Sequence, residues 1–117
     1  MDIQIQINVD CSDLDRMADF YIAALGYVAY GTAGEQYRSI LPGDGKGPTL
    51  VFQKVPEPKS VKNRVHLDLI VGDIEAEAER FVELGATRVS AEPLGEYGCQ
   101  WIVMHDPEGN ELCLCDS

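Results

Sequence analysis

The chain has 117 residues, which is enough for one domain with a buried core. Hydrophobic residues make up 45% and charged residues 25%, the balance of a globular protein rather than a disordered one. Nine basic residues against twenty acidic residues give a formal net charge of -11. This charge disfavours nucleic acid and membrane surfaces as partners, because both are anionic.

The chain shows no sign of export or membrane insertion. No apolar run approaches the length of a membrane span, and MDIQIQINVD lacks the basic and apolar regions of a signal peptide. The cysteines have neither zinc-ribbon nor CxxC spacing; they are Cys11, Cys99, Cys113 and Cys115. We therefore expect a cytoplasmic protein with reduced thiols.

The first half begins with a strand and a helix. Residues 3–9 alternate between β-branched residues and Gln or Asn, the pattern of a strand with one apolar face. CSDLDRMADFYIAALGY then has an apolar stripe at helical spacing, with Ser12 or Asp13 as its cap and Gly26 at its end. We expect shorter strands at 27–30, 36–41 and 49–55, followed by a proline-containing linker.

The second half repeats this order. VHLDLIVGD alternates, with an apolar face on its odd-numbered residues and with His66 and Asp68 on the opposite face. Asp73 then caps a helix that ends at Gly85. Strands are expected at 87–90, 98–105 and 110–115, and the tight turn DPEG joins the last two as a hairpin.

The two halves can be aligned with each other. DLDRMADFYIAALG, from Asp13, matches DIEAEAERFVELG, from Asp73, and Gln6 and His66 each lie seven residues before these caps. The repeat predicts an α+β fold of two βαβββ modules in one domain, 1–117, with module 1 at about 1–56, a linker at about 56–63 and module 2 at about 64–117. The strand faces that carry Gln6 and His66 are then turned away from the helices.

With these features in place, the sequence resembles the vicinal oxygen chelate superfamily, which includes glyoxalase I, extradiol dioxygenases, and bleomycin- and fosfomycin-resistance proteins. The resemblance covers essentially the whole chain and is carried by the paired modules, by SDLDRMADFYIAALGY and by WIVMHDPEGNELCLC. It looks most like the small glyoxalase-like proteins with a centre such as FQKVPEPKSVKNRVHLDL. The resemblance implies an open, cupped mixed β-sheet with helices on its outer face, and a small ligand or divalent metal in the concavity.

The resemblance also implies site residues. The first-strand ligand positions of the two modules map onto Gln6 and His66. The final-strand glutamate of metal-binding members falls at Cys113, with Glu111 two residues earlier on the same face. The implied metal set is therefore His66, Gln6 and Glu111, around Zn, Ni, Fe or Mn. The last strand of the first module has no carboxylate within 51–53, so the usual acidic pair is missing or displaced.

Each of these residues also has a simpler interpretation. A histidine on a strand can pair with a neighbouring carboxylate, here Asp68, and Gln6 and Asn8 fit the solvated face of a half-buried strand. Cys113 fits a small packed hydrophobe as well as a metal ligand. Trp101 is either an aromatic wall for a flat ligand or a core residue.

Two functions follow as alternatives. The first is a divalent-metal-dependent lyase, isomerase or dioxygenase that binds a small molecule between its modules. The second is a metal-free small-molecule binding or sequestration protein of the resistance type. The expected ligand-binding residues are Gln6, Asn8, His66, Trp101 and Cys113, and no catalytic residue is assigned. We also predict a homodimer, because open sheets leave edges that need covering.

Overall fold

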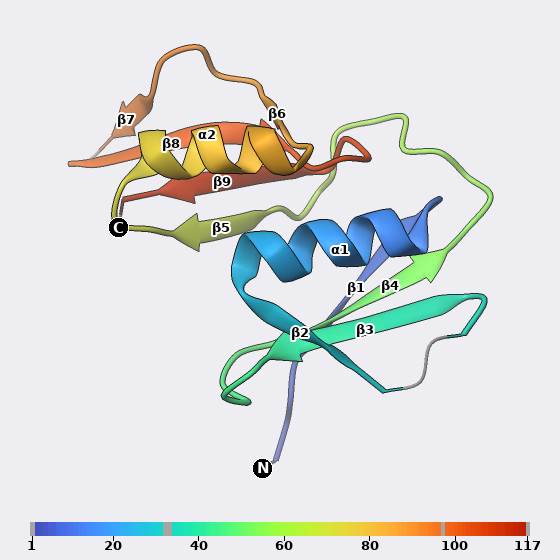
Figure 1. Cartoon of the computed structure of the whole chain (residues 1–117). Helices are drawn as coiled ribbons and strands as arrows, with labels where there is room; N and C mark the ends of the chain where they lie inside the picture. The colour runs from blue at the N-terminus through green and yellow to red at the C-terminus, as the bar shows by residue number, and fades with distance from the viewer. Residues whose placement is uncertain (1, 32–33, 97, 117) are drawn as a thin grey trace. The chain divides into compact units, whose positions relative to one another are not determined.

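The computed structural model describes residues 2–31, 34–96 and 98–116, which fall into two compact units, Met1–Pro58 and Lys59–Ser117. Each unit has a mixed β-sheet with one helix across one face (Figure 1). The predicted α+β class is therefore confirmed. That the two sheets join into one cupped surface within a single domain stays a prediction.

The first unit has the predicted βαβββ order. Its elements are β1 (Gln6–Cys11), α1 (Leu14–Leu25), β2 (Tyr27–Tyr30), β3 (Tyr37–Pro42) and β4 (Thr49–Lys54). The strand order in the sheet is β1-β4-β3-β2, with β1 and β4 parallel and the other pairs antiparallel. The first and last strands of the unit are therefore direct neighbours.

The second unit repeats this plan with one additional strand. Its elements are β5 (Leu67–Ile70), α2 (Ile74–Leu84), β6 (Thr87–Arg88), β7 (Leu94–Glu96), β8 (Cys99–His105) and β9 (Glu111–Cys115). The strand order is β5-β9-β8-β6, with β7 also paired to β8. Again the first strand, β5, runs parallel to the last strand, β9.

Both helices begin and end where the sequence predicts. The side chains of Asp13 and Asp73 each accept a hydrogen bond, at 3.1 Å, from the backbone N–H three residues further on. Gly26 and Gly85 end the helices with φ values of 71° and 119°, a left-handed conformation that L side chains rarely adopt. Neither helix, in the part of the chain that the structure describes, has the length and apolar character needed to cross a bilayer.

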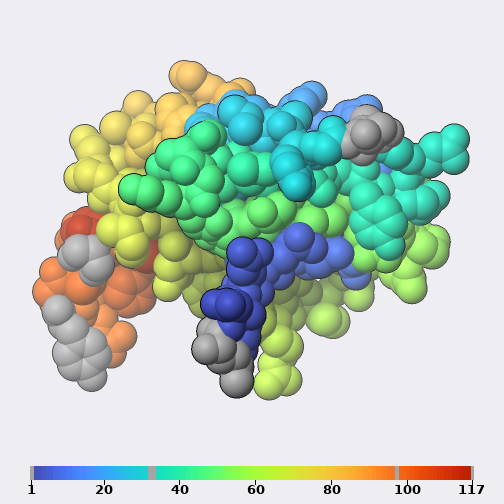
Figure 2. Space-filling view, turned by 90° about the horizontal axis from the view of Figure 1, so that it is seen from below, coloured from blue at the N-terminus to red at the C-terminus, as the bar shows by residue number. Residues whose placement is uncertain are grey.

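The strand β1 starts later than predicted. The alternating pattern suggested a strand from residue 3, but Ile3 and Ile5 lie outside it and are 72% and 75% exposed. Gln6 pairs with Thr49, so Ile5 would lie opposite Pro48, which has no N–H to donate to the ladder. Figure 2 shows this N-terminal segment, in dark blue, standing out from the surface.

The strands of the second unit also differ from prediction at their ends. β5 is shorter than the predicted 65–71, because its partner β9 begins only at Glu111, two residues after the turn. β6 stops at Arg88, whose side chain donates hydrogen bonds to the carbonyls of Ser90 and Ala91, at 2.8 and 3.1 Å. The chain returns to the ladder as β7, which the sequence did not predict.

Strand alternation divides the second sheet into two faces. Ile102, Met104, Leu112 and Leu114 are completely buried on one face, and α2 packs against the strands β8 and β9 that carry them. Because successive residues of a strand point to opposite sides, the residues between them are turned to the other, open face. That open face holds the candidate site.

Candidate functional site

An open pocket of about 570 Å³ lies on the open face of the second sheet. All of its lining residues belong to the second unit, from β5, β8, β9 and the segment before β5. They are Lys62, His66, Asp68, Ile70, Cys99, Gln100, Trp101, Val103, Glu111, Cys113 and Cys115. Apolar and sulfur-containing side chains predominate, with a few polar groups among them.

The register of three strands builds the floor of the pocket. Cys113 on β9 pairs with Asp68 on one side and with Val103 on the other. The next row on the same face consists of Ile70, Cys115 and Trp101, in the same strand order. The floor therefore joins β5 to two strands that lie more than thirty positions further along the chain, and β9 supplies its centre.

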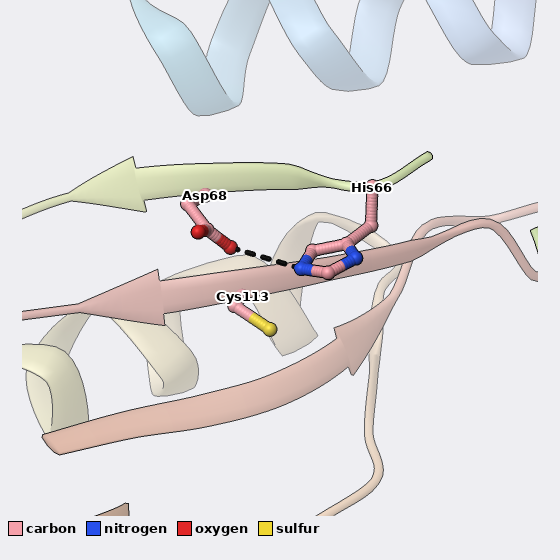
Figure 3. A group of neighbouring side chains, drawn as sticks. All are labelled: His66, Asp68 and Cys113. Carbon is pink, nitrogen blue, oxygen red and sulfur yellow. Dashed lines mark ion pairs between the residues drawn. The ribbon is translucent and has the colours of Figure 1, made fainter. Parts of the chain in front are cut away.

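His66 lies directly before β5 and forms a pair with Asp68. Its Nε2 is 3.1 Å from Oδ1 of Asp68, and the two side chains are 41% and 57% exposed. A proton on Nε2 makes this contact a hydrogen bond to the carboxylate, which leaves Nδ1 as an acceptor. Figure 3 shows this pair, and both of its side chains belong to the pocket lining.

Cys113 places a protonated thiol beside this pair. Burial, the negative charge of Asp68 and the neighbouring Cys115 together raise the pKa of the Cys113 thiol to about 11, although Lys62 acts in the opposite direction. At neutral pH the sulfur therefore carries its proton and is a poor nucleophile. Burial likewise raises the pKa of the Cys115 thiol.

His66, Asp68 and Cys113 together offer a nitrogen, an oxygen and a sulfur donor. These three atoms lie within 4.8 Å of one another (Figure 3). A divalent ion bound by such groups has bond lengths of about 2.0–2.3 Å, so small side-chain movements bring all three into reach. The donor set fits a borderline ion such as zinc, with room for a further ligand from the open side.

Glu111 lines the pocket but already has partners. Its Oε1 pairs with Nζ of Lys59 at 3.0 Å, and its Oε2 accepts a hydrogen bond from the backbone N–H of Asn63 at 3.1 Å. Burial acts to raise the pKa of Glu111, but these hydrogen bonds and one from its own backbone outweigh it and lower the pKa to about 2. The metal-ligand role predicted for Glu111 stays a prediction, and both of its oxygens are in use.

The structure places the other expected residues in two different locations. Trp101 lies in the pocket with His66 and Cys113, on the floor row that includes Ile70. Gln6 and Asn8 lie in the first unit, where they are exposed on β1 and pair with Thr49 and Val51. The ligand-binding roles predicted for these two residues stay predictions.

Seven of the eleven lining residues were not predicted as site residues, and two of these, Asp68 and Lys62, are charged. Asp68 appeared in the sequence as a partner of His66, and their shared strand parity is the signal that also places it in the pocket. Lys62 falls in the segment interpreted as a linker, and no local pattern indicates that it lines a pocket. Its position follows from contacts that its neighbours Lys59 and Asn63 make with Glu111, about fifty positions further along the chain.

Comparisons with known proteins agree on the family. A model of the glyoxalase-like domain matches residues 6–115. No curated protein matches the sequence.

Several solved structures share the fold. A glyoxalase/bleomycin resistance protein/dioxygenase family enzyme from Burkholderia phytofirmans PsJN has a TM-score of 0.76 at 18% identity, covering 94% of each chain. The fosfomycin resistance protein FosX from Mesorhizobium loti has 0.75 at 16% identity, covering 100% of this chain and 93% of its own. The oxidase ChaP-H2 has 0.74 at 19%, covering 100% and 95%. The chain is therefore a member of the glyoxalase-like domain family, within the vicinal oxygen chelate superfamily.

Proposed function

We propose that the second unit binds a small, partly aromatic molecule in its pocket, with Trp101 as the aromatic wall. The observation that carries this proposal is the pocket itself, which has a volume of about 570 Å³ and is lined by apolar and sulfur-containing side chains together with several polar ones. Ligand sites of drug-sized molecules have this size and this composition. This is the binding alternative derived from the sequence, restricted to one unit.

Different lining residues would make the apolar and the polar contacts with the ligand. Trp101, Ile70 and Val103 offer apolar area against which a ring can be removed from water. The His66–Asp68 pair presents an acceptor at Nδ1 for a hydroxyl or amide of the ligand. The buried thiol of Cys113 adds a weak donor.

The test uses the single tryptophan of the chain as its reporter. Benzamide is titrated to millimolar concentration while the indole N–H signal of Trp101 is followed in a proton–nitrogen correlation spectrum. We expect a saturable shift that Val103→Arg abolishes, because the new side chain fills the pocket. Val82→Arg makes the same change on the exposed side of α2 and should leave the titration unchanged. An indole signal that does not move in the wild-type protein would refute binding at this wall.

A second candidate is metal-dependent catalysis of the lyase, isomerase or dioxygenase type. It is favoured by the grouping of His66, Asp68 and Cys113, whose donor atoms lie within 4.8 Å. A zinc, nickel, iron or manganese ion bound there would supply a Lewis acid to ligand oxygens. His66 and Asp68 would then orient the ion from the exposed wall, and Cys113 would hold it at the floor.

Metal analysis separates the two candidates. Protein purified without a histidine tag is reconstituted with each ion, dialysed and analysed by mass spectrometry. Stoichiometric metal that disappears in His66→Ala and Cys113→Ser supports the second candidate. His105→Ala is the matched control, because His105 lies on β8 outside the three-residue group. Retention of metal by His66→Ala, or no metal after reconstitution, removes this candidate and leaves the first.

We also propose a homodimer in the cytoplasm. Each sheet has two outer strands, β1 and β2 in the first and β5 and β6 in the second. Within the described residues, each outer strand pairs with a neighbour in its own sheet along one edge only. Such edges are commonly covered by a second copy. All four cysteines lie in the described ranges, and the structure has them as free thiols. Sedimentation equilibrium at micromolar concentration tests the dimer, and a mass of one chain would exclude it.

A further inference from the structure

In the described part of the chain, some charged side chains of the pocket lining form ion pairs, and one does not. Asp68 is paired with His66 at 3.1 Å, and Glu111 is paired with Lys59 at 3.0 Å. Lys62 also lines the pocket, and it has no ion pair or hydrogen bond with any residue in the described ranges. Both carboxylates of the lining are therefore engaged, while one ammonium group remains available to a ligand.

The segment that carries Lys62 is held in place on both sides. Before it, Nζ of Lys59 donates to the carbonyl of Val61 at 2.7 Å as well as to Glu111. After it, Asn63 donates from its backbone to Glu111 at 3.1 Å and from Nδ2 to Oδ1 of Asn110 at 2.9 Å. A lysine on a free linker would sample many positions, but these contacts restrict the backbone at Lys62 to the pocket edge.

Lys62 also acts electrostatically on the pocket floor. Its positive charge opposes the rise of the Cys113 pKa, against the larger effects of burial and Asp68. The net charge of -11 repels every anion from the whole protein. That long-range field is screened over about 8 Å at physiological ionic strength, so at the pocket the nearby charges matter most, and Lys62 is the lysine among them.

We propose that the pocket selects aromatic molecules that carry an anionic group, a carboxylate in the simplest case. The ring lies against Trp101 and the anion pairs with Lys62. Asn63 is a positioning residue, because it anchors the segment without touching the ligand. This inference rests on the proposed function and specifies the ligand class of the same pocket.

The test compares benzoate with benzamide, two probes of nearly equal shape of which only benzoate is charged at neutral pH. Both are titrated against the Trp101 indole signal. We expect wild-type protein to bind benzoate about threefold to fivefold more tightly than benzamide, the size of an exposed ion pair. Lys62→Gln should bring the ratio of the two affinities to about one, and Lys62→Arg should restore it.

Arg64→Gln is the matched charge control. It removes the same charge two residues away, from an exposed side chain outside the pocket lining. An equal effect of Arg64→Gln and Lys62→Gln would show that only long-range charge matters and would overturn the role of Lys62. Asn63→Ala changes no charge, and we expect it to lower the benzoate-to-benzamide ratio about twofold through a looser segment.

The outcomes also separate this inference from the proposed function. Equal binding of benzoate and benzamide to wild-type protein refutes the anion selectivity and leaves the aromatic pocket intact. If neither probe moves the indole signal, both proposals fall. A ratio that stays at the wild-type value in Asn63→Ala refutes the positioning role alone.

Discussion

The two units have the same sheet plan but carry different chemistry on their open faces. In each unit the first strand runs parallel to the last, in equivalent register. The three members of the donor cluster stand where the first unit has neutral side chains: His66 for Gln6, Asp68 for Asn8 and Cys113 for Val51. The scaffold therefore does not determine the site, because the same backbone positions support an amide face in one unit and a donor cluster in the other.

The cores between helix and sheet should contribute about equally to the stability of the two units. Replacing a large buried side chain with a small one in each core should give the largest effect of all the predicted changes. Phe52 in the first unit and Phe81 in the second are 0% and 1% exposed. We expect Phe52→Ala and Phe81→Ala each to cost about 3–5 kcal/mol in the free energy of unfolding, measured by urea denaturation. Val82→Ala, on the exposed side of α2, is the control and should change stability by less than about 1 kcal/mol.

The next largest effect should distinguish the units. Glu111→Gln removes a charged acceptor from two hydrogen-bond donors and should cost about 1–3 kcal/mol at pH 7. Thr49 occupies the equivalent position in the first unit, and Thr49→Val should have a much smaller effect.

The cost of Glu111→Gln should also depend on pH. Because the pKa of Glu111 is lowered from 4.5 to about 2 in the folded protein, its stabilisation is fully present above pH 4.5 and is lost as the pH falls towards 2. Urea midpoints of mutant and wild type should therefore converge across this window. A constant difference at every pH would contradict the assigned cause.

Removing the helix caps should affect the two units equally. Asp13→Ala and Asp73→Ala each delete one hydrogen bond to a helix N-terminus. We expect each to lower the free energy of unfolding by about 1 kcal/mol, with Asp→Asn retaining most of the stability. A difference of more than about twofold between the two sites would show that the helices contribute unequally.

The smallest effect on stability is expected from a substitution that gives the second unit the residue of the first. Cys113→Val gives the second unit the residue that the first unit has at Val51, and both side chains are buried, at 8% and 7% exposure. We expect a change in stability within about 1 kcal/mol, because the volumes are similar. A large loss would show that the thiol makes a structural contact that valine cannot replace.

The local features of the fold could be predicted from the sequence, and the long-range ones could not. Alternation in VHLDLIVGD was sufficient to predict that His66 and Asp68 lie on the face away from the helix. The cap of α2 was predicted as Asp73, and that of α1 as Ser12 or Asp13, of which the structure has Asp13. The start of β1 was predicted wrongly, because it depends on Pro48, which directly precedes the partner strand β4.

The candidate site was predictable only in part, for the same reason. The approach of Cys113 to His66 requires the parallel pairing of β5 with β9, and no local pattern specifies that register. The contacts of Glu111 with Lys59 and Asn63 join residues that are 52 and 48 positions apart. The place of Lys62 in the pocket could not be predicted for the same reason, because the position of a linker residue depends on contacts that form only when the chain folds.

The central place of β9 in the second sheet has a consequence for biosynthesis. β9 is the last strand of the unit to be made, yet it lies between β5 and β8 and supplies the middle of the pocket floor. A nascent chain that has reached only β8 has the pocket residues of β5 and β8 but lacks the central strand of the floor. The unit can therefore complete its pocket only after β9 has left the ribosome. Until then the edges of β5 and β8 that later pair with β9 are exposed to chaperones and to neighbouring chains.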